Sequence, residues 1–213
     1  GTLSILKQAN AGAVAAAYLT SLSPYTSPDV VPNVTLDGDT VDYTFKHTGA
    51  ADRWNNYLAD VTTIVSDYFA ASPTKDRDET NPFAGEVFEI PVTFPAPTDP
   101  AVDRGTSGIL LTVIFENSSL SSDQTISVMF GHAETTGQTT EFNFDAIGSG
   151  GVSGSYLALG ISWSSSRTSD QNGTGQISTL EVAADDGAFT LLSDEAGGAD
   201  DSVVKTANNG LIT

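Results

Sequence analysis

The chain has 213 residues, with 27 Asp and Glu against 8 Lys and Arg, so its formal net charge is −19 at pH 7. A protein that binds nucleic acid or an anionic membrane directly needs a basic surface, and these few dispersed cations argue against both partners. The chain has no cysteine, which excludes disulfides, thiolate metal sites and thiol nucleophiles. No apolar run approaches the roughly 18 residues of a membrane span.

The charge predicts a high-salt environment. A shell of like charges repels itself and disfavours the compact state in dilute buffer. At molar salt the Debye length falls to about 3 Å, and that repulsion is largely screened. We therefore expect a protein from a hypersaline source; the alternative is an acidic secreted or phage protein from ordinary salt.

Residues 1–28 are predicted to form an N-terminal arm. The chain begins at Gly1, which indicates removal of an initiator Met, proteolytic maturation or trimming. Residues 3–22 are Ala-rich and weakly amphipathic, so we expect a short helix that ends before Pro24 and Pro28. Their small apolar side chains suit an arm that lies on another surface.

A hairpin and a second helix are expected next. In residues 33–45, Asp37-Gly38 suits a two-residue turn between alternating strands. Residues 52–71 have the clearest helical periodicity in the chain, with Asp52 as its cap and Pro73 after its end. The apolar stripe of this helix consists of Trp54, Tyr57, Leu58, Val61, Ile64, Val65, Tyr68 and Phe69.

The rest of the chain is predicted to be β structure. Residues 86–94 form a strand in which Pro91 indicates an edge or a bulge. Residues 108–116 are almost continuously apolar, which is typical of a strand buried on both faces. Further strands are expected at 125–131, 140–146, 155–163, 177–184 and 188–193, with Asp186-Gly187 as the turn between the last two. Residues 29–213 are therefore predicted to be a single domain that is mainly β, an antiparallel β-sandwich, jelly-roll-like, with the helix at about 52–71 packed against it.

The search for catalytic and cofactor sites leaves no candidate residue. His47 and His132 are isolated near strand ends and do not have metal-ligand spacing. Residues 148–154, GSGGVSG, lack the Lys and the helix of a phosphate loop, and the chain has no G-x-S-x-G elbow. Glu86 and Glu89 lie on opposite faces of one strand and do not form an acid–base pair. We expect no enzyme activity, no cofactor and no small-molecule substrate.

Acidic loops at 36–42, 183–188 and 193–202 are the candidates for a calcium site, and none matches a calcium-binding loop. The first two are explained as hairpin turns. The third carries Asp194, Glu195, Asp200 and Asp201 around a Gly-Gly pair. We interpret it as a solvated acidic loop, with a bound cation as the alternative, because so anionic a chain contains acidic clusters by chance.

Three glycosylation sequons begin at Asn33, Asn117 and Asn172. About two would arise by chance in a chain so rich in Ser and Thr, so they carry little weight as modification sites.

An acidic, cysteine-free β-sandwich with a small-residue arm and one strong helix resembles the single jelly-roll major capsid proteins of icosahedral, membrane-containing viruses of halophilic archaea. The resemblance covers about residues 30–206 and rests on architecture and composition. It implies an eight-stranded jelly roll, homo-oligomeric capsomers in the virion, and a second capsid protein as partner. It also implies that the N-terminal arm faces an internal membrane or neighbouring subunits.

The strong helix has no place in a minimal jelly roll, so two alternatives stay open. The tail-tube proteins of tailed viruses also combine a β-sandwich, one packed helix and long polymerising loops. A secreted carbohydrate-binding or adhesin module would show exposed aromatic residues on one sheet face. Tyr156 and Trp163 fall on opposite faces of their predicted strand, which weakens that alternative.

Overall fold

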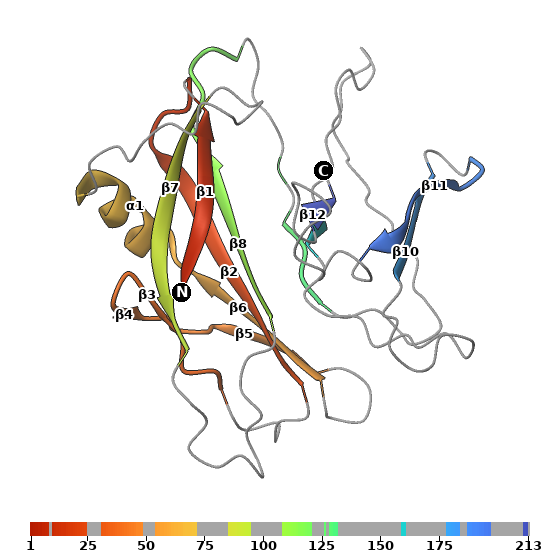
Figure 1. The fold of residues 1–213 in the computed structure, drawn as a ribbon, viewed down its shortest axis with the longest axis horizontal. Coiled ribbons are helices and arrows are strands. Elements are labelled where there is room, and N and C mark those ends of the chain that lie inside the picture. Colours follow the sequence, from red (N-terminus) through yellow and green to blue (C-terminus); the bar gives the residue numbers. More distant parts are fainter. Residues whose placement is uncertain are drawn as a thin grey trace. The chain divides into compact units, whose positions relative to one another are not determined.

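The computed structural model describes residues 1–8, 10–24, 31–48, 54–71, 85–94, 108–120, 126, 128–131, 159–160, 178–183, 187–196 and 211–212. The chain divides into two compact units, Gly1–His132 and Ala133–Thr213. Within the described residues, the first unit contains two four-stranded antiparallel sheets and the helix α1, and the second contains two-stranded ladders (Figure 1). The predicted boundaries of the arm, 1–28, and of the sandwich domain, 29–213, stay a prediction.

The strands of the first unit come together from distant parts of the chain. One sheet has the order β1-β7-β3-β4, with bounds Thr2–Gln8, Gly85–Thr93, Thr35–Leu36 and Asp39–Thr40. The other has the order β5-β6-β2-β8, with bounds Phe45–Thr48, Trp54–Asp60, Val14–Pro24 and Gly108–Phe115. Leu3 pairs with Ile90 in the first sheet, and Leu19 lies between Ala59 and Leu111 in the second.

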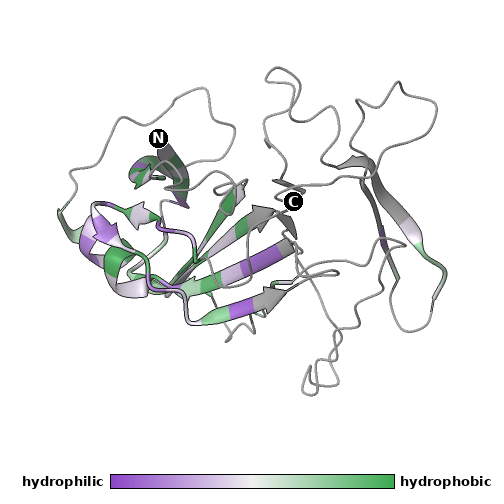
Figure 2. Ribbon diagram, turned by 90° about the horizontal axis from the view of Figure 1, so that it is seen from below, coloured by the Kyte–Doolittle hydropathy of each residue, from purple (hydrophilic) through white to green (hydrophobic). Residues whose placement is uncertain are grey.

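Both sheets and the helix contribute to one core. Successive side chains of a strand point to opposite faces, so alternate residues are buried. Figure 2 shows the resulting succession of hydrophobic and hydrophilic residues along the strands of this unit. The buried cluster consists of Ile5, Ala17, Leu19, Val34, Leu36, Val41, Ala59, Val61, Val65, Tyr68, Phe88, Ile90 and Val92. The prediction of a mainly β, antiparallel protein with one helix is confirmed at this level.

The helix predicted over residues 3–22 is wrong, because this segment forms β1 and β2. β2 is an inner strand that pairs with both β6 and β8, so its backbone groups are satisfied on both sides. Its core-facing positions are Ala17, Leu19 and Ser21, which are all buried. Ala17 is small and Ser21 is polar, so the alternation of apolar and polar residues that identifies a strand is not visible in this part of the sequence. Tertiary pairing overrides the helical propensity of the alanines.

The helix predicted over residues 52–71 is correct only in its second half, since β6 (Trp54–Asp60) precedes α1 (Thr62–Ala71). Asn55, Tyr57 and Ala59 are buried at alternate positions, which is the period of a strand. The predicted cap, Asp52, lies outside the described residues. Asp60 fulfils this role instead, since its Oδ1 accepts bonds from the Thr62 N–H (2.9 Å) and the Thr62 hydroxyl (2.6 Å). These two bonds hold the pKa of Asp60 below its ordinary value.

The edge strand or bulge predicted at Pro91 is wrong, because β7 lies between β1 and β3 and pairs with both without a register shift. The Val92 N–H donates to the Gly1 carbonyl at 2.9 Å, so the backbone groups of Val92 point toward β1 and those of Pro91 point away from it. The Pro91 carbonyl accepts from the Asp37 N–H at 2.8 Å. Asp37 begins the turn from β3 to β4, so the β3–β7 ladder ends at this point. The missing N–H of Pro91 therefore removes no hydrogen bond from the middle of the ladder.

Tyr68 anchors α1 to β7 beyond the end of β3. The backbone groups of Glu89, like those of Pro91, point away from β1, toward the side of β7 on which β3 lies. β3 has only two residues, which pair with Val92 and Thr93, so it does not extend far enough to pair with Glu89. The Tyr68 hydroxyl donates to the Glu89 carbonyl at 2.9 Å and satisfies it.

Replacing Tyr68 with Phe is expected to lower the free energy of unfolding by about 1 kcal/mol, because the part-buried hydrogen bond to the Glu89 carbonyl is lost. Denaturant titration at molar NaCl measures this loss. Phe69→Leu on the same helix leaves the bond in place and serves as a control for packing effects. An unchanged midpoint for Tyr68→Phe would show that the bond does not hold the helix.

The hairpin predicted around Asp37-Gly38 is confirmed. β3 and β4 pair antiparallel, and both turn residues have positive φ, 51° and 91°. This is the backbone conformation that Asp-Gly adopts in a two-residue hairpin loop.

The predicted strands of residues 86–94 and 108–116 correspond to β7 and β8. β8 is half-buried along its whole length instead of fully buried, because it is an edge strand of its sheet. The strand predicted at 125–131 is not formed at the described residues 126 and 128–131. Residues 140–146 lie outside the described residues.

The second unit confirms one predicted hairpin and only part of another strand. β10 (Ser178–Val182) pairs antiparallel with β11 (Thr190–Ala196), as expected for the strands at 177–184 and 188–193. The register shifts twice along this pair. Of the strand predicted at 155–163, β9 (Leu159–Gly160) is formed, paired with β12 (Leu211–Ile212).

Candidate functional site

The main buried polar cluster consists of Ser21, Tyr43, Asn55 and Tyr57, which we call the tyrosine cluster. Ser21 and Asn55 are the buried polar residues of the described core, on the neighbouring strands β2 and β6. The Ser21 and Tyr43 hydroxyls are hydrogen-bonded, and the rings of Tyr43 and Tyr57 lie 5.6 Å apart between centroids at an angle of 60°. Ser21, Tyr43 and Tyr57 are therefore in contact with one another, and Asn55 lies two residues before Tyr57 on the same face of β6.

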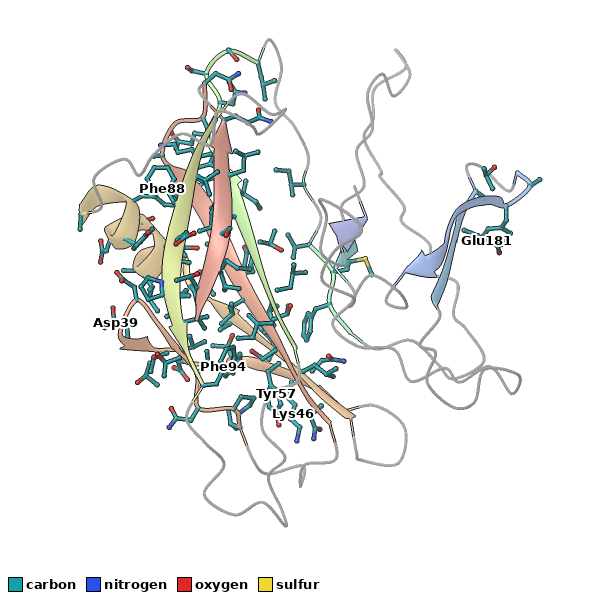
Figure 3. All side chains as sticks on the ribbon, viewed as in Figure 1. Asp39, Lys46, Tyr57, Phe88, Phe94 and Glu181 are labelled. Atoms are coloured by element: carbon teal, nitrogen blue, oxygen red, sulfur yellow. The ribbon has the colours of Figure 1, made fainter. Side chains whose placement is uncertain are left out.

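Lys46 lies beside the tyrosine cluster, on the edge strand β5. It pairs with Tyr57 across β5 and β6, and its Nζ lies 6.0 Å from the centroid of the Tyr57 ring (Figure 3). This distance is at the limit of a cation–π contact. The cluster thus combines two phenols, an amide and an ammonium group.

Burial raises the pKa of Tyr43 to about 12. The bond to Ser21 acts in the opposite direction, and the neighbouring Tyr57 adds to the rise. A phenol with so high a pKa stays protonated at neutral pH, so Tyr43 contributes a neutral hydroxyl to the core and is not activated as a base or nucleophile.

The Tyr43 pKa predicts a loss of stability at alkaline pH. The folded value of about 12 lies above the ordinary value of 10.0. The stabilisation is therefore fully present below pH 10 and is lost as the pH rises through 12, by roughly 2 kcal/mol. Tyr43→Phe has nothing to ionise at this position, so its unfolding free energy should fall less over the same range. Denaturant titrations of both proteins at pH 9 and pH 11.5 measure the difference; parallel losses would contradict the assignment.

A groove of about 340 Å³ separates β1 from β8, which are edge strands of the two sheets. Ser4, Leu6 and Gln8 line one side, and Leu111, Val113 and Glu116 are among the residues that line the other. Above this region, Lys7 Nζ lies 5.6 Å from the ring centroids of both Phe69 and Phe115. The Lys7 ammonium therefore lies within cation–π distance of two aromatic rings.

Gly12 and Glu116 approach each other closely near the groove. Its N–H donates to the Glu116 carbonyl at 2.6 Å, and the Glu116 N–H donates to the Ala13 carbonyl at 2.9 Å. A Cβ on Gly12 would lie 3.2 Å from the Glu116 oxygen, tighter than ordinary contact. This residue extends the pairing of β2 and β8 beyond the register bulge between Val14 and Ala16.

The acidic segment at 193–202 is not a single loop. Asp194 and Glu195 lie in β11, and Asp200 and Asp201 lie outside the described residues. Among the residues that the structure describes, no group of three or more metal-ligating side chains comes together. A bound cation at this segment and its alternative, a solvated surface, both stay predictions.

Of the other features singled out in the sequence, the structure describes His47, Asn33 and Asn117. His47 lies in β5 and His132 lies outside the described residues. The Asn117 sequon forms a turn after β8, in which the Asn117 Oδ1 accepts bonds from the N–H (3.0 Å) and hydroxyl (2.6 Å) of Ser119. Asn33 is exposed two residues before the start of β3, and Asn172 lies outside the described residues.

The sequence interpretation missed the tyrosine cluster and the β1–β8 groove because it assigned residues 3–22 and 54–60 to helices. The alternation of Leu3 and Ile5 with Thr2, Ser4 and Gln8 is the signal that could have revealed β1. The only described helix, α1, has 10 residues and is too short to cross a bilayer.

No family model, curated protein or solved structure matches the chain at a significant level.

Proposed function

We propose that the chain is a structural subunit of a virion, a capsid building block that assembles with copies of itself in a high-salt environment. The observation that carries the proposal is the core shared by two four-stranded antiparallel sheets, in a chain of net charge −19. Facing sheets with a common core favour a β-sandwich, the architecture of many capsid subunits. The subunit is not an enzyme and needs no cofactor.

The strand order favours a second candidate, a tail-tube subunit of a tailed virus. A jelly roll consists of two Greek keys, each with three consecutive strands joined by hairpins. In the orders β1-β7-β3-β4 and β5-β6-β2-β8, only β3-β4 and β5-β6 are consecutive neighbours. α1 also contributes Val65 and Tyr68 to the core, so the helix is integral to this unit. A sandwich with one integral helix is the combination that resembles tail-tube proteins.

The proposed partners follow from the two candidates. In a capsid the chain forms homo-oligomeric capsomers with a second capsid protein, and its N-terminal segment contacts neighbouring subunits or an internal membrane. In a tail tube it forms rings of identical subunits that stack. Neither role requires nucleic acid or a small-molecule substrate.

Electron microscopy of the chain purified in molar NaCl, with light scattering for mass, tests the proposal. Closed capsomers support the capsid role, and open rings that stack into tubes support the tail-tube role. A stable monomer that never assembles with copies of itself would overturn both. Glycan binding by that monomer would identify a carbohydrate-binding module instead.

A further inference from the structure

β1 presents an open sheet edge to its surroundings. Because Gly1 and Val92 exchange backbone hydrogen bonds, the odd-numbered residues of β1 point their N–H and C=O groups toward β7. The even-numbered residues point theirs away from the sheet. The Gln8 carbonyl accepts from the Ala11 N–H at 2.9 Å. The edge groups of Thr2, Ser4 and Leu6 have no backbone partner within the described part of the chain, where β1 pairs with β7 alone.

This edge is accessible. Thr2, Ser4 and Gln8 are exposed, and Leu6 is half-buried at the β1–β8 groove. Exposed edge strands are templates for pairing with another chain unless charges, proline or a bulge protect them. In β1 the only charge is Lys7, near the end of the strand, and no proline or bulge interrupts the pairing with β7.

The distribution of charge along the chain favours a second copy of the same chain as the partner of this edge. Residues 1–28 contain no Asp or Glu and a single Lys, although the whole chain carries 27 acidic residues. β8, on the other side of the groove, has no charged residue, and Glu116 directly after it is the one carboxylate among the lining residues. Two copies of a chain with net charge −19 repel one another over most of their surface, so a strip without carboxylates is where they approach at the lowest electrostatic cost.

We infer that β1 pairs antiparallel with β1 of a second copy of this chain, an inference that rests on the proposed role as a self-assembling subunit. A two-fold axis at Ser4 places Thr2 opposite Leu6 and Ser4 opposite Ser4. This register uses the edge groups of all three residues and forms about six hydrogen bonds between the copies. A self-complementary contact of this kind closes after two copies.

The side chains fit the same register. On the core side of the sheets, Leu3 of one copy meets Ile5 of the other, so the apolar layer continues across the interface. On the outer side the opposed side chains are Thr2, Ser4 and Leu6, which carry no charge. Lys7 falls opposite Gly1 at each end of the paired strands, where the Gly1 ammonium is held by the Val92 carbonyl at 2.9 Å, so the only like charges that meet lie at the ends of the pairing.

Ser4→Pro tests the pairing, with Ser4→Ala as its matched control. Proline removes an N–H that points away from β7, so the intrachain ladder is kept, and edge strands tolerate proline. Two interchain hydrogen bonds are lost at the symmetry axis, which should raise the dimer dissociation constant about tenfold or more. Sedimentation at molar NaCl measures it, and circular dichroism verifies the fold. An unchanged dissociation constant for folded Ser4→Pro would overturn the inference.

Cross-linking tests the register independently, and the absence of native cysteine makes single thiols unambiguous. Ser4→Cys should give a disulfide-linked dimer on mild oxidation, because opposed residues of an antiparallel pair lie within the Cα separation that a disulfide spans. Thr40→Cys, exposed on β4 at the other edge of the same sheet, should remain monomeric.

The outcomes separate this inference from the proposed function. Higher assemblies that form equally well from wild type and Ser4→Pro, without a Ser4→Cys cross-link, would overturn β1 pairing and leave the virion role intact. A Ser4-dependent dimer that forms no larger particle would support β1 pairing and count against the virion role.

Discussion

Transfer from molar to millimolar NaCl is expected to unfold the chain. With a net charge of −19, the folded state concentrates carboxylates on a small surface, and the unfolded chain separates them. Lowering the salt from 1 M to 0.01 M extends the Debye length from about 3 Å to about 30 Å, so repulsion across the whole surface returns. Far-UV circular dichroism during stepwise dialysis should show the β signal disappear within this range.

A charge variant separates repulsion from other effects of salt. Asp39, Asp42, Asp67 and Glu89 are exposed, and replacing them with their amides changes the net charge from −19 to −15. This variant should unfold at a lower NaCl concentration than the wild type. Structure retained by the wild type in millimolar salt would contradict a high-salt origin for the charge. Coincident transitions of the two proteins would assign the salt effect to something other than these carboxylates.

Leu19→Ala is expected to lower the free energy of unfolding by about 2–5 kcal/mol. Leu19 is 0% exposed and lies in β2, between Ala59 and Leu111, so its side chain faces the core shared by both sheets. Neighbouring strands hold the backbone on both sides, so the cavity cannot collapse freely. A typical domain has about 5–15 kcal/mol in total, and this one change removes a large part of it.

Leu120→Ala is the matched control, because Leu120 is 51% exposed in the turn after β8. It should change the unfolding free energy by no more than about 0.5 kcal/mol. Guanidinium titrations at constant high ionic strength compare the two variants with the wild type. Equal effects at both positions would mean that Leu19 is not in the core.

The parts of the fold that the sequence predicted are those with local signals. Asp37-Gly38 specifies its own turn, because Gly adopts positive φ without strain and Asp tolerates it. Residues 85–93 and 108–115 are strands because apolar β-branched and aromatic residues recur in them at short range. The second half of the helix predicted over residues 52–71 is α1, and its apolar stripe includes the buried residues Val65 and Tyr68. Absence of cysteine and the charge of −19 follow directly from composition.

The sequence by itself determined a mainly β, antiparallel and strongly acidic protein, because turn chemistry, strand periodicity and charge are properties of short segments. Only the tertiary structure decided that residues 3–24 and 54–60 form strands instead of helices. An alanine-rich segment favours a helix in isolation, but the backbone of β2 pairs with β6 on one side and β8 on the other, and Ala17 is fully buried in the core. The tyrosine cluster depends on the pairing of β2 with β6, and the open edge of β1 depends on the pairing of β1 with β7. Both pairings join residues far apart in the chain.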